Sequence, residues 1–459
     1  MDVLIAVSFT LIGFFCIGFV TLKLKPNPLY CLHAVLFWGF VVGFNSLSAW
    51  ANDTRNDQSI YILVHLLLLA YLTIYLWFAS ILSSPSETDS LFSSIRSLTP
   101  TTLALSMIPW LVFRIYLLIK YGAASFQLLA LRQEVDASYL EASLNTLLLY
   151  PALGAFFAYI IKAVFDPRTL LNPLITALSS FIFLFVCLFS ELLSSRRFMF
   201  SILVLIGLIL VYRQEASPKM LRPRIFMMGG LLGLITLALA EFYQQIRYNL
   251  FEPEFLSLIN EGDILSIARA VFVYFTLEAS VQHTVVPVES FATVENLMER
   301  FSPFQVMYAI SERQIDDFTT TNGRILLQSF YNVIPSAFLP LKETKNADEF
   351  IAEAYDLEDT DLPTGILSSF QSDISWAAFV LTPLLMVVLI SGYKKLLLSS
   401  QDSLSKLVLL GLCILTATYV EALFDAVLVN LRDLMLLLAF GMMLRHARKL
   451  FSSPRPTLN

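Results

Sequence analysis

Charged residues are scarce in this sequence of 459 residues. Asp, Glu, Lys and Arg make up 14% of it, whereas hydrophobic residues make up 57%; soluble domains carry roughly 25% charged residues. This composition excludes a soluble globular enzyme. The formal net charge is −6, and binding of nucleic acid calls for a basic patch or stripe. We therefore expect no nucleic-acid partner.

Cysteine and histidine are also rare, with four residues of each. All four cysteines fall inside apolar runs, which indicates small buried side chains rather than a disulfide or metal framework. His33 and His65 also lie in apolar runs and are expected to be packed or hydrogen-bonded. His283 has no second His or Cys at metal-ligand spacing. We expect neither a bound metal nor a cofactor, and the sequence has no phosphate-binding loop, dinucleotide fingerprint or nucleophile elbow.

What the sequence does contain is a series of apolar blocks of about 20 residues, the length that crosses about 30 Å of hydrocarbon as a helix. This pattern predicts an all-α, polytopic membrane protein with about 11 transmembrane helices. The first block has no basic region before it and no small-residue cleavage site, so we expect it to be retained. The predicted spans are 3–22, 30–50, 60–82, 100–119, 146–165, 173–192, 196–212, 225–243, 376–393, 406–423 and 428–444.

The spans divide the chain into three predicted parts. Residues 1–243 form an N-terminal transmembrane bundle, 244–375 a large loop, and 376–459 the C-terminal helices and tail. Most Lys and Arg residues in short loops fall on one side, which places the N-terminus outside, the C-terminus inside and the large loop outside the cytoplasm. The loop is rich in aromatic residues and is expected to pack onto the membrane helices. Asp348–Tyr355 is predicted to form a short helix within it.

Two adjacent arginines, Arg196 and Arg197, stand in a short predicted outer loop, where the orientation rule disfavours them. If a helix begins here, its free amide groups and positive dipole end would join the two guanidinium groups in binding a phosphate or diphosphate. Alternatively, both side chains extend to lipid headgroups at the interface. Arg132 and Arg247 are candidates for the same outward-facing cluster, with the same interfacial alternative.

Charged residues inside the predicted spans need partners, a polar cavity or an interfacial position, because a charge at the bilayer centre is costly. Glu191 lies near the predicted outer end of its span. Arg432 is expected to neutralise Asp425 or Glu421 as a structural pair rather than to act in catalysis.

Several short motifs follow one another between residues 120 and 393. Ser195-Arg196-Arg197 opens a predicted helix, and Tyr243 to Arg247 ends one. The large loop then contains Gly323-Arg324, Asn332-Val333-Ile334-Pro335 and Leu339-Pro340-Leu341-Lys342. This order resembles the bacterial O-antigen and exopolysaccharide repeat-unit polymerase family. The sequence departs from the family pattern at Glu343, where the family often has proline, and in its weak Tyr and Gly enrichment before residue 376.

The resemblance implies a metal-independent type C membrane glycosyltransferase of the bacterial inner membrane. Such an enzyme transfers a glycan linked to undecaprenyl diphosphate onto a lipid-linked repeat unit at the periplasmic face. Its implied partners are the lipid-linked oligosaccharide and membrane lipids, with a chain-length regulator and a flippase as further candidates. The alternatives are an O-antigen ligase, a polysaccharide or lipid transporter, and a noncatalytic scaffold.

The resemblance and the charge pattern together select candidate site residues. Arg196 and Arg197 would stabilise the departing diphosphate, and Glu191 is a candidate general base. The candidate substrate-binding residues are Arg132, Arg247, Arg324 and Lys342.

Overall fold

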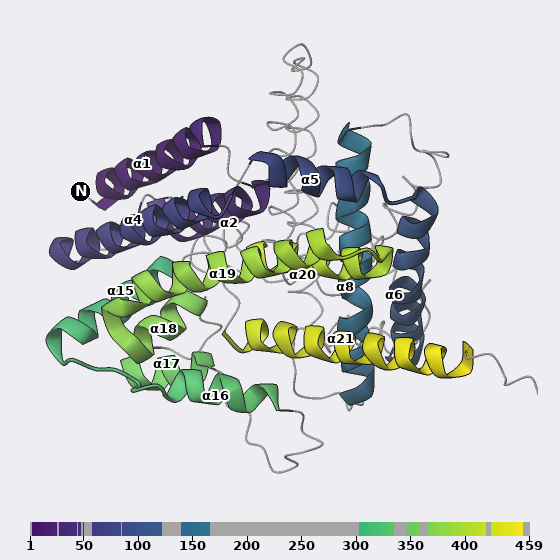
Figure 1. The fold of residues 1–459 in the computed structure, drawn as a ribbon. Coiled ribbons are helices and arrows are strands. Elements are labelled where there is room, and N and C mark those ends of the chain that lie inside the picture. Colours follow the sequence, from purple (N-terminus) through teal and green to yellow (C-terminus); the bar gives the residue numbers. More distant parts are fainter. Residues whose placement is uncertain are drawn as a thin grey trace, which may run out of the picture.

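The structure is a computed structural model, drawn in Figure 1. It describes residues 2–24, 27–43, 45–46, 49, 57–83, 85–121, 139–165, 303–334, 347–357, 365–418 and 424–452. These ranges form helices and connecting turns and contain no strand. Four apolar helices in them are long enough to cross a membrane: Asp2–Lys23, Gln58–Ile81, Pro100–Leu117 and Ile366–Ser399.

The described part of the chain is therefore all-helical and that of a membrane protein, as the apolar blocks predicted. Eight of the predicted spans overlap helices of the structure. The spans 173–192, 196–212 and 225–243 lie outside the described residues, so the count of eleven stays a prediction, as does the division into three parts. The helices that overlap spans are α1 (Asp2–Lys23), α2 (Pro28–Trp38) with its π-helical continuation η1 (Gly39–Gly43), α4 (Gln58–Ile81), α6 (Pro100–Tyr121), α8 (Tyr139–Phe165), α19 (Ala378–Ser399), α20 (Ser403–Thr418) and α21 (Phe424–Ser452).

These helices enclose an aromatic core with internal polar contacts. His33 is buried, with its Nε2 atom 3.2 Å from the Tyr71 hydroxyl and its Nδ1 atom 3.1 Å from the Ala417 carbonyl oxygen. His65 is also buried, with Nδ1 2.8 Å from the Tyr61 carbonyl oxygen. Both histidines are thus packed and hydrogen-bonded, as predicted. Such contacts matter in a membrane helix, because lipid offers a polar group no hydrogen bond.

Among the described helices, α8 and α20 are in very close contact. A Cβ atom added at Gly154 would collide with the carbonyl oxygen of Leu407, and one at Gly411 would collide with that of Tyr150. Between helices in lipid the hydrophobic effect is absent, and close packing through small residues takes its place. In the view of Figure 1, α6 and α8 run across the direction of α19 and α20.

The two ends of the bundle differ in chemistry. At one end, α5 (Pro85–Arg96) connects α4 to α6. Here Lys394 donates a hydrogen bond of 3.0 Å to the Leu82 carbonyl at the end of α4, and Lys162 donates one of 2.9 Å to the Arg96 carbonyl at the end of α5. Both ammonium groups therefore stand at the negative ends of helix dipoles. We call this the lysine end.

The opposite end, which we call the loop end, carries four short helices from the predicted large loop (Figure 1). They are α15 (Pro303–Asp316), α16 (Arg324–Val333), α17 (Ala347–Tyr355) and α18 (Ile366–Ile374). A 3-10 turn, η5 (Ser375–Ala377), joins α18 to α19. Helix α17 confirms the short helix predicted over Asp348–Tyr355.

Helix α15 rests on the bundle. The Tyr308 hydroxyl accepts a hydrogen bond of 2.8 Å from the backbone amide of Asp57, which caps α4. The ring of Phe304 lies 4.4 Å from that of His65 and 5.1 Å from that of Tyr61, measured between centroids. The prediction that the loop packs onto the membrane helices is thus confirmed for the described part of the loop.

Replacing Gly411 with alanine is expected to destabilise the bundle, because the added methyl group would overlap the Tyr150 carbonyl of α8. Overpacking typically costs about 1 to 3 kcal/mol. The measurement is the midpoint of thermal unfolding of the detergent-solubilised chain. Gly392→Ala in α19 is the matched control, because nothing lies within 4 Å of its added methyl group. Equal shifts of the two variants would contradict the close α8–α20 contact.

Candidate functional site

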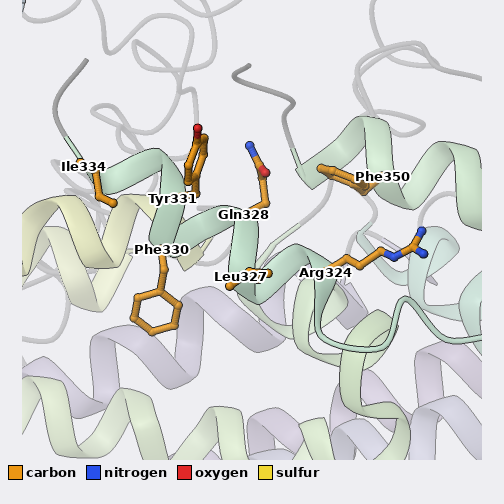
Figure 2. Close-up of a pocket in the computed structure, with 7 residues that line it drawn as sticks. All are labelled: Arg324, Leu327, Gln328, Phe330, Tyr331, Ile334 and Phe350. Atoms are coloured by element: carbon orange, nitrogen blue, oxygen red, sulfur yellow. The ribbon is translucent and has the colours of Figure 1, made fainter. Parts of the chain in front are cut away.

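A pocket at the loop end contains Arg324, the candidate site residue that lies within the described ranges. Its volume is about 540 Å³. Figure 2 shows its walls, which α16 provides on one side and Phe350 of α17 on the other. The lining residues are Arg324, Leu327, Gln328, Phe330, Tyr331, Ile334 and Phe350.

The start of α16 depends on a carboxylate from another helix. Gly323 precedes α16 with φ of 81°, in the left-handed region that glycine adopts without strain, and it has no side chain to cap the helix. Asp373 of α18 supplies the cap instead. Its carboxylate accepts hydrogen bonds from the amides of Gly323 at 3.1 Å, Ile325 at 3.3 Å and Leu326 at 2.7 Å, and from the hydroxyl of Thr321.

The Asp373 cap lowers the positive potential that the start of α16 would otherwise give the pocket. Asp373 is only 6% exposed, so its negative charge and its hydrogen bonds stay at the helix start. The amides that would otherwise attract an anion to the positive end of the helix are already occupied. Arg324, the first residue of α16, is exposed and extends along the α17 side of the pocket (Figure 2). Within the described ranges, no carboxylate pairs with its guanidinium group.

The other end of α16 is tied to the bundle by Arg432 of α21. The Nη1 atom of Arg432 donates a hydrogen bond of 3.0 Å to the carbonyl of Val333, the last residue of α16. Its Nε and Nη2 atoms donate to Oδ1 of Asp433 at 2.9 and 2.8 Å. Asp433 is buried, and its Oδ2 atom accepts a hydrogen bond of 3.1 Å from the Tyr150 hydroxyl of α8. The pocket helix is therefore connected through one guanidinium group to two membrane helices.

Of the two predicted partners of Arg432, Asp425 is wrong, because the ion pair among the described residues forms with Asp433. Glu421 lies outside the described residues, so that alternative stays a prediction. Seven residues separate Arg432 from Asp425, roughly 10 Å along a helix. The adjacent carboxylate of Asp433 is within reach, and its burial makes a charged partner necessary. Arg432 keeps the structural role that was predicted for it.

Aromatic rings also pack α16 against α18 and α21. Phe424, at the start of α21, contacts Phe330 of α16 and Phe370 of α18 edge to face, with ring centroids 5.8 and 5.1 Å apart. Such pairs add about 0.5 to 1.5 kcal/mol beyond the burial of their area.

The helices beneath the pocket share a polar interior. Gln314 of α15 donates a hydrogen bond of 2.7 Å to the carbonyl of Gln371, and the Gln371 side chain donates one of 2.8 Å to the Ser311 hydroxyl. The Tyr355 hydroxyl of α17 contacts the carbonyl oxygens of Ser372 and Thr319 at 3.2 and 3.3 Å. Burial raises the pKa of Tyr355 above its ordinary value, so the phenol stays protonated and can donate.

Most of the predicted site lies outside the described residues. The predicted cationic cluster therefore stays a prediction. Sequence reasoning found Arg324 through the Gly323-Arg324 motif, but it missed Asp373, Gln328 and Phe350. A single acid in the stretch before α19 was the available signal for Asp373. The candidates outside the described residues are Arg132, Glu191, Arg196, Arg197, Arg247 and Lys342.

Among the described residues, no three His, Cys, Asp or Glu side chains gather in a way that could hold a metal ion. No protein-family model, curated protein or solved structure matches the chain.

Replacing Asp373 with alanine is expected to release the start of α16, because three backbone amides and the Thr321 hydroxyl lose their acceptor. Leaving buried donors unsatisfied costs about 1 to 3 kcal/mol each. Hydrogen–deuterium exchange of the full chain should show faster exchange of the peptide that contains the amides of Ile325 and Leu326.

Asp317→Ala is the control for that experiment. Asp317 is exposed and pairs with Arg313 at 3.7 Å, and a surface ion pair of this kind contributes about 0 to 1 kcal/mol. Unchanged exchange in Asp373→Ala would contradict the assigned capping role.

Proposed function

We propose that the chain is a multi-pass membrane glycosyltransferase that polymerises lipid-linked repeat units. The donor is a glycan on undecaprenyl diphosphate, and the acceptor is a new lipid-linked unit. In this proposal the protein resides in the bacterial inner membrane, and the loop end faces the periplasm. Lipid-linked oligosaccharide and membrane lipids are the partners, together with a chain-length regulator and a flippase.

One observation carries the proposal. A pocket with aromatic walls and an arginine that no carboxylate of the described ranges pairs with lies on short helices, which pack on the end of an apolar bundle. A lipid-linked glycan has an apolar anchor, a charged link and a sugar chain beyond the membrane. The bundle suits the apolar anchor and the pocket suits the sugar chain, while the predicted cationic cluster would take the charged link. Most ligand sites are likewise largely apolar clefts with a few placed polar groups.

The proposed reaction is a displacement at the anomeric carbon. An acceptor hydroxyl oxygen forms a bond to this carbon while the bond from the carbon to the lipid diphosphate oxygen breaks. The hydroxyl proton passes to a base, for which Glu191 is the candidate, and the diphosphate leaves with the bonding electron pair. Arg196 and Arg197 stabilise the charge that develops on the departing diphosphate, an electrostatic effect that usually dominates such catalysis. Arg132, Arg247 and Lys342 would assist in binding the donor.

Replacing Arg196 and Arg197 with alanine should abolish long polymer, because removing one such charged donor typically slows the chemical step by about 10²- to 10³-fold. The measurement is a gel of surface polysaccharide from a deletion strain complemented with each variant, at matched levels of membrane-inserted protein. Arg313→Ala, a paired arginine on α15, is the control and should leave the ladder unchanged. Wild-type polymer from the Arg196 and Arg197 variants would reject their catalytic role.

The deletion strain itself separates a polymerase from a ligase. Loss of a polymerase leaves single repeat units attached to the lipid A core, whereas loss of a ligase leaves polymer on the carrier lipid. The first result is the one that we expect.

A further inference from the structure

Among the described residues, few positive charges lie at the α16 pocket. Arg324 is the cation among its lining residues. The nearby Arg313 is engaged by Asp317 and Asp356, each at 3.7 Å. Asp373 occupies the amides at the start of the helix. A diphosphate carries at least two negative charges and calls for several donors, whereas one guanidinium group matches a single carboxylate in a planar, two-bond fork.

The pocket walls suit a sugar ring. Tyr331 and Gln328 project to one side of α16, and Phe350 of α17 stands on that same side (Figure 2). The flat faces of the two aromatic rings can cover the apolar C–H face of a pyranose and remove it from water. The volume of about 540 Å³ falls within the range of about 300 to 1,000 Å³ typical of small-molecule sites.

The pocket is therefore suited to a sugar that is both apolar on one face and singly charged. We propose that it binds an acidic monosaccharide, a uronic acid, within the growing glycan. Arg324 takes the carboxylate, and Tyr331 and Phe350 hold the ring. The inference rests on the proposed function, because the glycan is the substrate, and it adds the chemical class of one sugar. It also assigns the α16 pocket to the sugar chain and leaves the lipid diphosphate to other residues.

The test compares two disaccharides with the full-length protein in nanodiscs of neutral lipid. One is glucuronosyl-β-1,4-glucose, and the other is its neutral counterpart cellobiose. Dissociation constants are measured by isothermal titration calorimetry. We expect the acidic disaccharide to bind at least about tenfold more tightly, as a charge-assisted pair with two hydrogen bonds allows.

Three variants assign that preference to the pocket. Arg324→Ala should bring the affinity for the acidic disaccharide down to that for cellobiose, while leaving the affinity for cellobiose unchanged. Tyr331→Ala should weaken both ligands. Arg313→Ala, the matched arginine control, should change neither.

Three results would overturn the assignment: equal affinity for the two disaccharides, no binding of either, or a preference that survives in Arg324→Ala. Inorganic pyrophosphate serves as competitor. If it displaces the acidic disaccharide at a concentration below the dissociation constant of that disaccharide, in an Arg324-dependent manner, the pocket is a diphosphate site instead.

The binding assay requires no turnover, so its failure is separable from failure of the proposed function. If the protein shows no preference for the acidic disaccharide and the Arg196→Ala and Arg197→Ala variants still make wild-type polymer, both the sugar assignment and the proposed catalytic role are rejected. Loss of the preference with abolished polymer in those variants would remove the sugar assignment alone.

Discussion

Two charged groups at opposite ends of α16 hold the loop end in its observed form. The buried carboxylate of Asp373 satisfies the amides at the start of the helix, and the guanidinium group of Arg432 binds the last carbonyl. Helix termini leave four donors and four acceptors without partners inside the helix, so a ten-residue helix such as α16 depends strongly on outside partners. Without these anchors, neither the pocket nor the direction of Arg324 would be defined.

Both anchors come from helices that belong to the membrane domain or continue into it. Asp373 lies on α18, which η5 joins to α19, and Arg432 lies on α21 beside the buried pair of Asp433 and Tyr150. A charged group that has been removed from water is retained only with good geometry and several hydrogen bonds, and both groups meet this condition. The pocket is thus attached to the bundle by polar contacts, which determine its position relative to α8, α19 and α21.

The sequence predicted the features that depend on local pattern. Apolar blocks located eight described helices, the acidic start and apolar spacing of 348–355 located α17, and a short motif located Arg324. It did not predict contacts across long separations: Leu326 and Asp373 are 47 residues apart, and Val333 and Arg432 are 99 apart. Helix α5 was missed because its composition is too polar for a span. The predicted pairing of Arg432 with Asp425 was wrong because opposite charge does not ensure a suitable distance, and the adjacent Asp433 lies closer.

In the proposed reaction the α16 pocket contacts the glycan. To test this contact, Tyr331 is replaced by the photoreactive p-benzoylphenylalanine, and the protein is irradiated in membranes that contain radiolabelled lipid-linked substrate. The control carries p-benzoylphenylalanine in place of Phe318. Phe318 lies in the connection between α15 and α16, is 86% exposed and is not among the residues that line the pocket. Irradiation is expected to label the protein through position 331 and not through position 318. Equal labelling at both positions, or labelling at 318 alone, would contradict the proposed contact.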